Sequence, residues 1–267
     1  MVNFGDALGR AWKYSTNLKR LGVFTLSLII ALAIVLLPLL SVLNTTTLSM
    51  IALNSVSLLT MIQFFTMLAV GIAVALLIYM YVILLFTHNY ANHSQKDASR
   101  RFVSLGKSAS FAKSRYLRFL GVVIVTGVIS GVVSMVPLIG IVFSIIAGLV
   151  FFFVHQEVAV SDNSISKSLT SSYGLFRKNI LDVIITCILA AILSVVIVLI
   201  FAIPIFVVGL TSAISAISTG GFLQVLMSNL LIFVITGLIL LVGVSLAILF
   251  SNSIKTDVYM QLKKKRN

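Results

Sequence analysis

The sequence predicts an all-α, polytopic membrane protein, and three observations support this fold class. The chain has 267 residues, of which 60% are hydrophobic and 9% are charged, whereas soluble domains carry roughly 25% charged residues. Six apolar segments are each long enough for a helix to cross the hydrocarbon core, which takes ~20 residues. All 19 Lys and Arg residues lie in segments that fall on one side of a six-span topology.

Six apolar segments are the predicted membrane-spanning helices. They lack the period-2 alternation of barrel strands, and only helices and closed barrels satisfy their backbone groups in lipid. A tight turn at 137–140 joins the third and fourth spans, because proline ends a helix and glycine allows a reversal. The predicted spans cover residues 21–43, 59–87, 118–136, 141–160, 180–202 and 222–250.

The positions of the cations predict the orientation. Four precede the first span, seven lie between the second and third spans or at the start of the third, three lie between the fourth and fifth, and five follow the sixth. Cytoplasmic segments carry the excess of Lys and Arg, so we expect a protein of the cell membrane with both termini in the cytoplasm. The net charge of +13 therefore indicates contact with membrane lipids, including anionic headgroups at the inner face, rather than with nucleic acid.

The chain is predicted to form one membrane domain over residues 1–267 with a threefold internal repeat. Pro38, Pro137 and Pro204 each lie near the outer end of an odd-numbered span, and an amphipathic segment begins about thirty residues before each of them. These segments show the 3.6-residue period of an interfacial helix. We therefore expect three hairpins, each preceded by an amphipathic interfacial helix. The predicted repeats are residues 1–87, 101–160 and 164–250.

Ionisable residues near the inner end of the fourth span form the candidate site. His155 and Glu157 are the deepest ionisable side chains, and Arg118 lies at nearly the same depth on the third span. A helix hairpin would bring Arg118 within reach of Glu157. The group is therefore either a buried ion pair that clamps the hairpin or a site for a lipid headgroup or an ion. Gly127 and Gly131 form a small-xxx-small face for packing within the chain or between copies, unless the motif arose by chance.

The function classes are limited by what the spans lack. No ionisable residue lies near the middle of a predicted span, where proton-coupled carriers, pumps and intramembrane hydrolases need one. We expect no cofactor, no metal and no enzymatic activity, but a role in packing, scaffolding or lipid organisation, alone, with a protein partner or as a homo-oligomer. The alternative is a transporter or channel for a small neutral or lipid-like solute. Its path would use hydroxyl groups inside the spans, namely those of Ser27, Thr66, Ser144, Ser194, Thr236 and Ser245.

Three parts of the chain resemble a broad set of uncharacterised prokaryotic six-span proteins, which are related to the membrane domain found beside some glycerophosphodiester phosphodiesterases. The resemblance lies in the opening FGDALGRAWKY (4–14), in the hairpin around Pro137, and in QEVAV (156–160), ISKSLTSSY (165–173) and RKN (177–179). It covers most of the chain as a pattern without a catalytic motif. The resemblance implies a six-span fold and a membrane location. The clustered acids and histidine of the phosphodiesterase catalytic domain are absent from the sequence.

Overall fold

A computed structural model describes residues 2–42, 58–96, 104–135, 140–219 and 221–264. Every secondary-structure element in these ranges is a helix, as the sequence predicts. Six segments are long and apolar enough to cross a membrane, so the chain is a multi-pass membrane protein. The helices are α1 (Phe4–Ser15), α2 (Leu18–Val42), α4 (Leu58–Lys96), α5 (Leu105–Ser134), α6 (Gly140–Val150), α7 (Val154–Ser161), α8 (Ile165–Lys178), α9 (Ile180–Thr219), α10 (Phe222–Ser228) and α11 (Leu230–Lys264).

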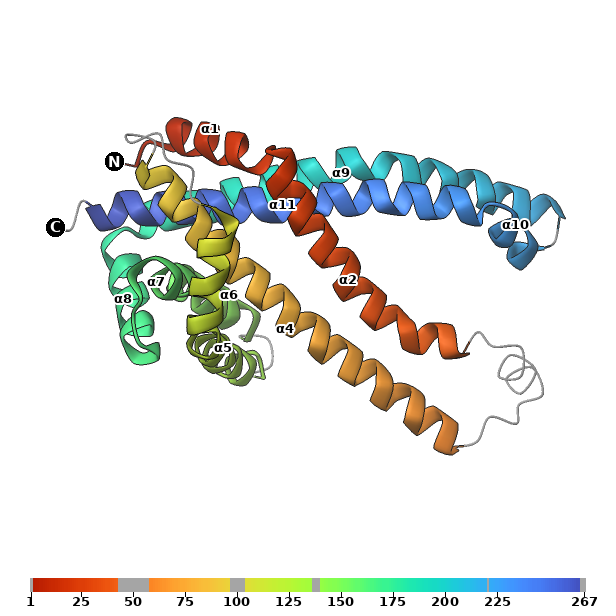
Figure 1. The fold of residues 1–267 in the computed structure, drawn as a ribbon, viewed down its shortest axis with the longest axis horizontal. Coiled ribbons are helices and arrows are strands. Elements are labelled where there is room, and N and C mark those ends of the chain that lie inside the picture. Colours follow the sequence, from red (N-terminus) through yellow and green to blue (C-terminus); the bar gives the residue numbers. More distant parts are fainter. Residues whose placement is uncertain (1, 43–57, 97–103, 136–139, 220, 265–267) are drawn as a thin grey trace.

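The long helices form three hairpins that meet at one end of the molecule (Figure 1). α9 and α11 lie side by side along the long axis, α2 packs against α4, and α5 packs against α6. Both termini lie at the same end as α1, α7 and α8. We call this end the hub; it comprises α1, α7, α8 and the adjoining ends of α2, α4, α5, α9 and α11. The α2–α4 hairpin leaves the hub at an angle to the α9–α11 hairpin, so the two hairpins diverge.

Short breaks separate two of the three predicted interfacial segments from the spans that follow. α1 is separated from α2 by Thr16 and Asn17, and α8 is separated from α9 by Asn179. Asn and Thr favour helix ends because their side chains bond to nearby backbone groups, as Asn179 does with the Leu175 carbonyl. The stretch at 115–119 contains no residue of this kind. The second predicted interfacial segment is therefore not a separate helix but the first part of α5.

α9 is longer than the predicted fifth span, because the helix continues through Pro204 to Thr219. The connection predicted at 203–221 is therefore mostly helical. A proline costs a helix one backbone N–H bond, but membrane helices tolerate it. Pro38 lies near the end of α2, as predicted, whereas the placement of Pro204 near a span end was wrong. Pro137 lies outside the described residues, and the threefold repeat stays a prediction.

The predicted fourth span is interrupted at 151–153, between α6 and α7. The Val154 N–H donates to the Phe151 carbonyl at 3.1 Å, three residues back, which tightens the turn. This shift leaves the Val150 carbonyl without its usual helical donor, and Ser172 Oγ of α8 donates to it at 2.9 Å. Irregular backbone at membrane depth is tolerated where the protein itself satisfies the freed groups. The interruption therefore attaches α8 to the fourth span.

Buried side chains concentrate at the hub, whereas the outer parts of the hairpins are exposed. On α9, for example, Phe206 is 71% exposed and Ile217 is 85% exposed. Lipid tails are as apolar as these side chains, so close packing and polar contacts, rather than the hydrophobic effect, must hold the helices together. The largest buried aromatic residues lie on hub segments: Tyr14, Phe24, Phe86, Tyr90, Phe119, Phe153 and Tyr259. The hub is therefore where the three hairpins are joined.

The close approach of α9 to α11 requires a glycine at position 243. A Cβ atom added to Gly243 would lie 2.2 Å from the Cβ of Phe201 on α9, far inside van der Waals contact. The Phe201 Cβ is bonded directly to its backbone, so rotation of the Phe201 side chain cannot relieve the clash. Any residue other than glycine at 243 would therefore push the two helices apart.

We expect Gly243→Ala to lower the free energy of unfolding by about 1–3 kcal/mol, the usual cost of overpacking. Unfolding in mixed detergent micelles, followed by circular dichroism, measures this change. Gly237→Ala on the same helix is the matched control, because an added Cβ there meets nothing within 4 Å. Equal stability of the two variants would contradict the proposed close contact.

The face of α5 that carries Gly127 and Gly131 has no packing partner in the part of the chain that the structure describes. A Cβ added at either glycine would meet nothing within 4 Å. α5 turns its other face to α4, α6 and α7, and Ile124, Val128 and Val132 are exposed beside the glycines. The described residues therefore supply no partner for the packing of this face within the chain. A contact between two copies stays a prediction.

Candidate functional site

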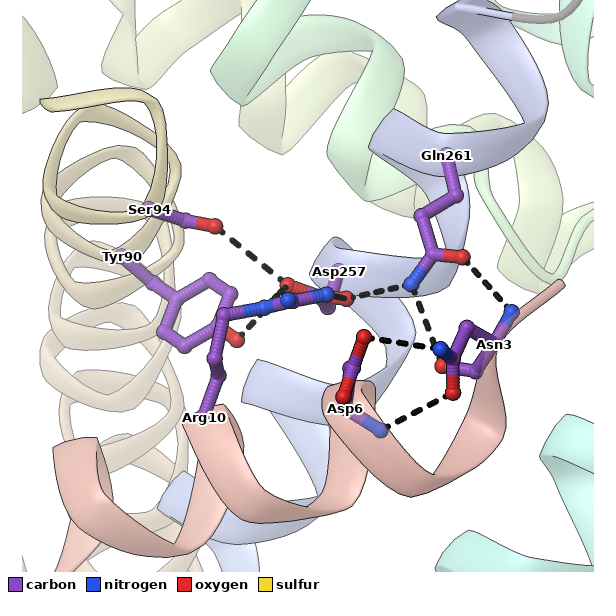
Figure 2. Close-up of polar contacts among 7 residues, drawn as sticks. All are labelled: Asn3, Asp6, Arg10, Tyr90, Ser94, Asp257 and Gln261. Atoms are coloured by element: carbon purple, nitrogen blue, oxygen red, sulfur yellow. Dashed lines mark hydrogen bonds and ion pairs between the residues drawn. The ribbon is translucent and has the colours of Figure 1, made fainter. Parts of the chain in front are cut away.

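Asp257 of α11 is the centre of a polar network that joins α1 and α4 to α11 (Figure 2). The Arg10 guanidinium donates to both carboxylate oxygens, at 3.0 and 2.7 Å. Tyr90 Oη and Ser94 Oγ donate to Oδ1 at 3.0 and 3.3 Å, and Gln261 Nε2 donates to Oδ2 at 2.8 Å. The hydrogen bond with the carboxylate raises the pKa of Arg10 above its ordinary value. Asp257 is 1% exposed, so these donors stabilise a charge that would be costly to bury alone.

Further contacts hold the two ends of α1 on the hub. At the N-terminal end, the Asn3 side chain accepts a hydrogen bond from the Asp6 N–H at 3.1 Å, and the Asn3 N–H donates to Gln261 Oε1 at 2.9 Å. At the other end, Tyr14 Oη donates to Asn89 Oδ1 of α4 at 2.8 Å. Burial raises the pKa of Tyr14, so its phenol keeps the proton that it donates. α1 is therefore fixed to both α4 and α11.

Glu157 of α7 is the centre of a second network, which joins α7, α8 and α11. Its side chain is fully buried. Oε2 accepts a hydrogen bond from Asn163 Nδ2 at 2.6 Å, and Oε1 accepts one from Ser171 Oγ of α8 at 2.7 Å. Lys263 Nζ of α11 lies 3.5 Å from Oε2. Both carboxylate oxygens are thus engaged within the chain, which favours the structural role of Glu157 over a headgroup site.

Arg118 does not pair with Glu157, contrary to the prediction. Arg118 Nη1 lies 2.7 Å from Asp162 Oδ1, and Arg115 Nη2 lies 2.5 Å from Asp162 Oδ2. Asp162 ends α7 with a φ of 53°, a left-handed conformation that aspartate tolerates better than most residues. This turn brings its carboxylate to α5, while Glu157 contacts α8 and α11. The prediction compared only the depths of Arg118 and Glu157 along the hairpin, and this comparison could not reveal the turn after α7.

A cavity of about 590 Å³ lies between α4, α5, α7, α9 and α11, within the ~300–1,000 Å³ typical of small-molecule sites. Along α9 and α11 its wall changes from apolar to polar toward the hub. On α9, Ser194 is nearest the hub, and Val195, Val198 and Leu199 lie farther out. On α11, the lining residues in order toward the hub are Val244, Ala247, Ile248, Ser251, Asn252 and Lys255. The helix rises by about 16 Å from the first of them to the last.

Lys255, His155 and Gln156 form the polar end of the cavity. The Lys255 ammonium lies 4.9 Å from the centroid of the Phe152 ring, a cation–π contact. Among the described residues no carboxylate lies within ion-pair distance of Lys255. Gln156 is 2% exposed, and its Oε1 has no hydrogen-bond partner in the part of the chain that the structure describes. The ring of His155 lies 5.1 Å from that of Phe119. This end therefore offers a positive charge and a hydrogen-bond acceptor.

The hydroxyl groups proposed to line the path of a neutral solute are mostly bonded to backbone. Ser194 Oγ lies 3.4 Å from the Ala247 carbonyl, across α9 and α11, and the buried Ser144 hydroxyl has no partner within the described ranges. Four residues donate to a carbonyl one turn earlier in their own helix, at 2.7–2.8 Å: Ser27, Thr66, Thr236 and Ser245. Hydroxyl groups bound in this way offer little to a passing solute.

The sequence argument missed Lys255 and Gln156 as site residues. Lys255 was assigned to a basic segment after the sixth span, whereas α11 continues through it to Lys264. The signal was the spacing of polar residues at 251, 252 and 255, which places them on one face of a helix. No group of three or more His, Cys, Asp or Glu side chains that could hold a metal ion occurs in the ranges described. Comparisons of the chain with family models, curated proteins and solved structures gave no match.

Proposed function

We propose that this multi-pass protein is a non-enzymatic, lipid-organising protein of the cell membrane that holds an amphiphilic molecule between its hairpins. The observation that carries this proposal is the cavity, with an aliphatic wall toward the diverging hairpins and a polar end at the hub. An amphiphile has the same order of apolar and polar parts. Its alkyl chain would pack against the aliphatic wall, and its headgroup would contact the polar residues at the other end of the cavity.

The orientation inferred from the cations supports this proposal. The described parts of the four basic segments adjoin the hub, so the positive-inside rule favours a cytoplasmic hub with both termini inside. The polar end of the cavity would then lie near the headgroups of the inner leaflet. Val195 and Leu199 are 57% and 61% exposed, so a lipid chain can reach this wall from the side. Because the span hydroxyls are bonded to backbone, transport of a small neutral solute is the weaker proposal.

The test of this function is lipid retention by a cavity-filling variant. Native mass spectrometry of the full chain in a mild detergent counts the lipid molecules that remain bound. We expect wild-type protein to retain lipid and Val198→Trp to lose most of it, because the indole would occupy the cavity. Val196→Trp is the matched control, since Val196 lies on the same helix, is 45% exposed and does not line the cavity. Equal retention by the two variants would contradict the proposal.

A further inference from the structure

We infer that the cavity selects amphiphiles whose headgroup carries a net negative charge, and that this charge pairs with Lys255. The inference rests on the proposed function, because it names the class of molecule that the cavity holds. The ligand would place one alkyl chain along Val198 and Ile248 and its anionic group at the polar end. A phospholipid with an acidic headgroup and a free fatty acid share this chemistry.

Four other cations at the hub lie beside a carboxylate. Arg10 pairs with Asp257, Arg118 and Arg115 pair with Asp162, and Lys263 lies near Glu157. Lys255 instead contacts the ring of Phe152 and lines a mainly apolar cavity. A charge in such surroundings is costly without a counter-ion. An anionic headgroup would supply that counter-ion.

The residues around the cavity also disfavour a headgroup that carries its own cation. Among the residues that the structure describes, no aspartate or glutamate lines the cavity, so an ammonium group on the ligand would lie near Lys255 without an acidic partner there. The acids nearest in sequence are Glu157, which accepts from Asn163 and Ser171, and Asp257, which pairs with Arg10. A zwitterionic lipid would therefore gain less from this site than an anionic one.

Gln156 adds a second polar contact for the headgroup. Gln156 lines the cavity, and its amide oxygen is buried and has no partner among the described residues. Burial of an unbonded polar atom is unfavourable, and a hydroxyl group on the ligand would correct it. The pair formed by Lys255 and Gln156 thus suits a headgroup with an anion beside a hydroxyl group, as in phosphatidylglycerol.

Competition between two lipids tests the inference. The full chain in detergent is titrated with phosphatidylglycerol and phosphatidylcholine of identical acyl chains, and native mass spectrometry measures each bound fraction. We expect an about fivefold preference for the anionic lipid, from the attraction that one lysine exerts on an anionic headgroup. Lys255→Gln should abolish the preference, and Lys255→Arg should retain it. Lys264→Gln, which removes an exposed lysine from the end of the same helix, should change nothing.

The outcomes separate this inference from the proposed function. If both lipids bind equally and Lys255→Gln has no effect, the charge selection is overturned while lipid binding stands. If Val198→Trp reduces the binding of neither lipid, both proposals fail. Displacement of bound lipid by palmitate supports an anionic amphiphile and identifies a single chain as sufficient. Displacement by glycerol phosphate alone would overturn the inference, because the site would then recognise a free phosphate.

Discussion

Replacing Asp257 with alanine is expected to lower the free energy of unfolding by about 3 kcal/mol. The substitution leaves Arg10, Tyr90 and Gln261 without their shared acceptor, and removal of one partner from a buried ion pair typically costs about 3–5 kcal/mol. The lower end applies here because the Arg10 side chain is 38% exposed and water can solvate it. Unfolding in mixed detergent micelles measures the loss.

The release of α1 provides a local readout of the same variant. Trp12 is the only tryptophan in the chain, and its ring lies 5.8 Å from that of Phe250 on α11 in an edge-to-face contact. In Asp257→Ala we expect the emission of Trp12 to change before the rest of the protein unfolds. Asp6→Asn is the control, because it removes an exposed charge from the same helix but leaves a side-chain oxygen that can accept from Asn3 Nδ2. An equally large effect of both substitutions would show that general charge loss, not the network, matters.

Replacing Glu157 with alanine is expected to destabilise the protein by about 3–4 kcal/mol. The carboxylate is fully buried and connects three helices through Asn163, Ser171 and Lys263. Its removal leaves Asn163 and Ser171 without this acceptor and Lys263 without its counter-ion, and it opens a void between α7 and α8. The unfolding free energy in micelles measures the total loss.

Limited proteolysis shows where the Glu157 variant is weakened. α8 contains Lys167, Arg177 and Lys178, at which trypsin can cut once the helix detaches. We expect faster cleavage there in Glu157→Ala than in wild type. Asp162→Asn is the matched control, because asparagine also tolerates the left-handed backbone there, and Asp162 is 41% exposed with ion pairs that contribute about 1 kcal/mol or less. Unchanged cleavage of α8 in Glu157→Ala would contradict the structural role of this residue.

The architecture could be predicted from the sequence because length, apolarity and charge are local properties. Each span needs only enough apolar residues in a row, so six helices and an all-α fold were predicted and confirmed. Helix ends were less predictable. Pro204 was read as a helix end, but α9 continues through it, because a membrane helix can lose one hydrogen bond without ending. The resemblance to the uncharacterised six-span proteins stays a prediction.

The candidate site was only partly predictable because its contacts depend on how separate hairpins meet. His155 was singled out and does line the cavity, since its depth follows from its position in the fourth span. The predicted partner of Arg118 was wrong, because counting residues along the two spans does not reveal the left-handed turn at Asp162. Lys255 was missed since a basic residue near a span end reads as a topology signal. Only the packing of α11 against α7 and α9 reveals its surroundings.

Photo-crosslinking tests most directly whether a lipid chain occupies the cavity. The full chain is reconstituted with a phosphatidylglycerol that carries a diazirine on one acyl chain, and the adducts are mapped by mass spectrometry. We expect the adducts to concentrate on Val198, Leu199 and Ile248, and to disappear from them in Val198→Trp. If adducts are no more frequent at these positions than at the exposed residues Ile124 and Ile217, the proposal that the cavity holds a lipid is contradicted.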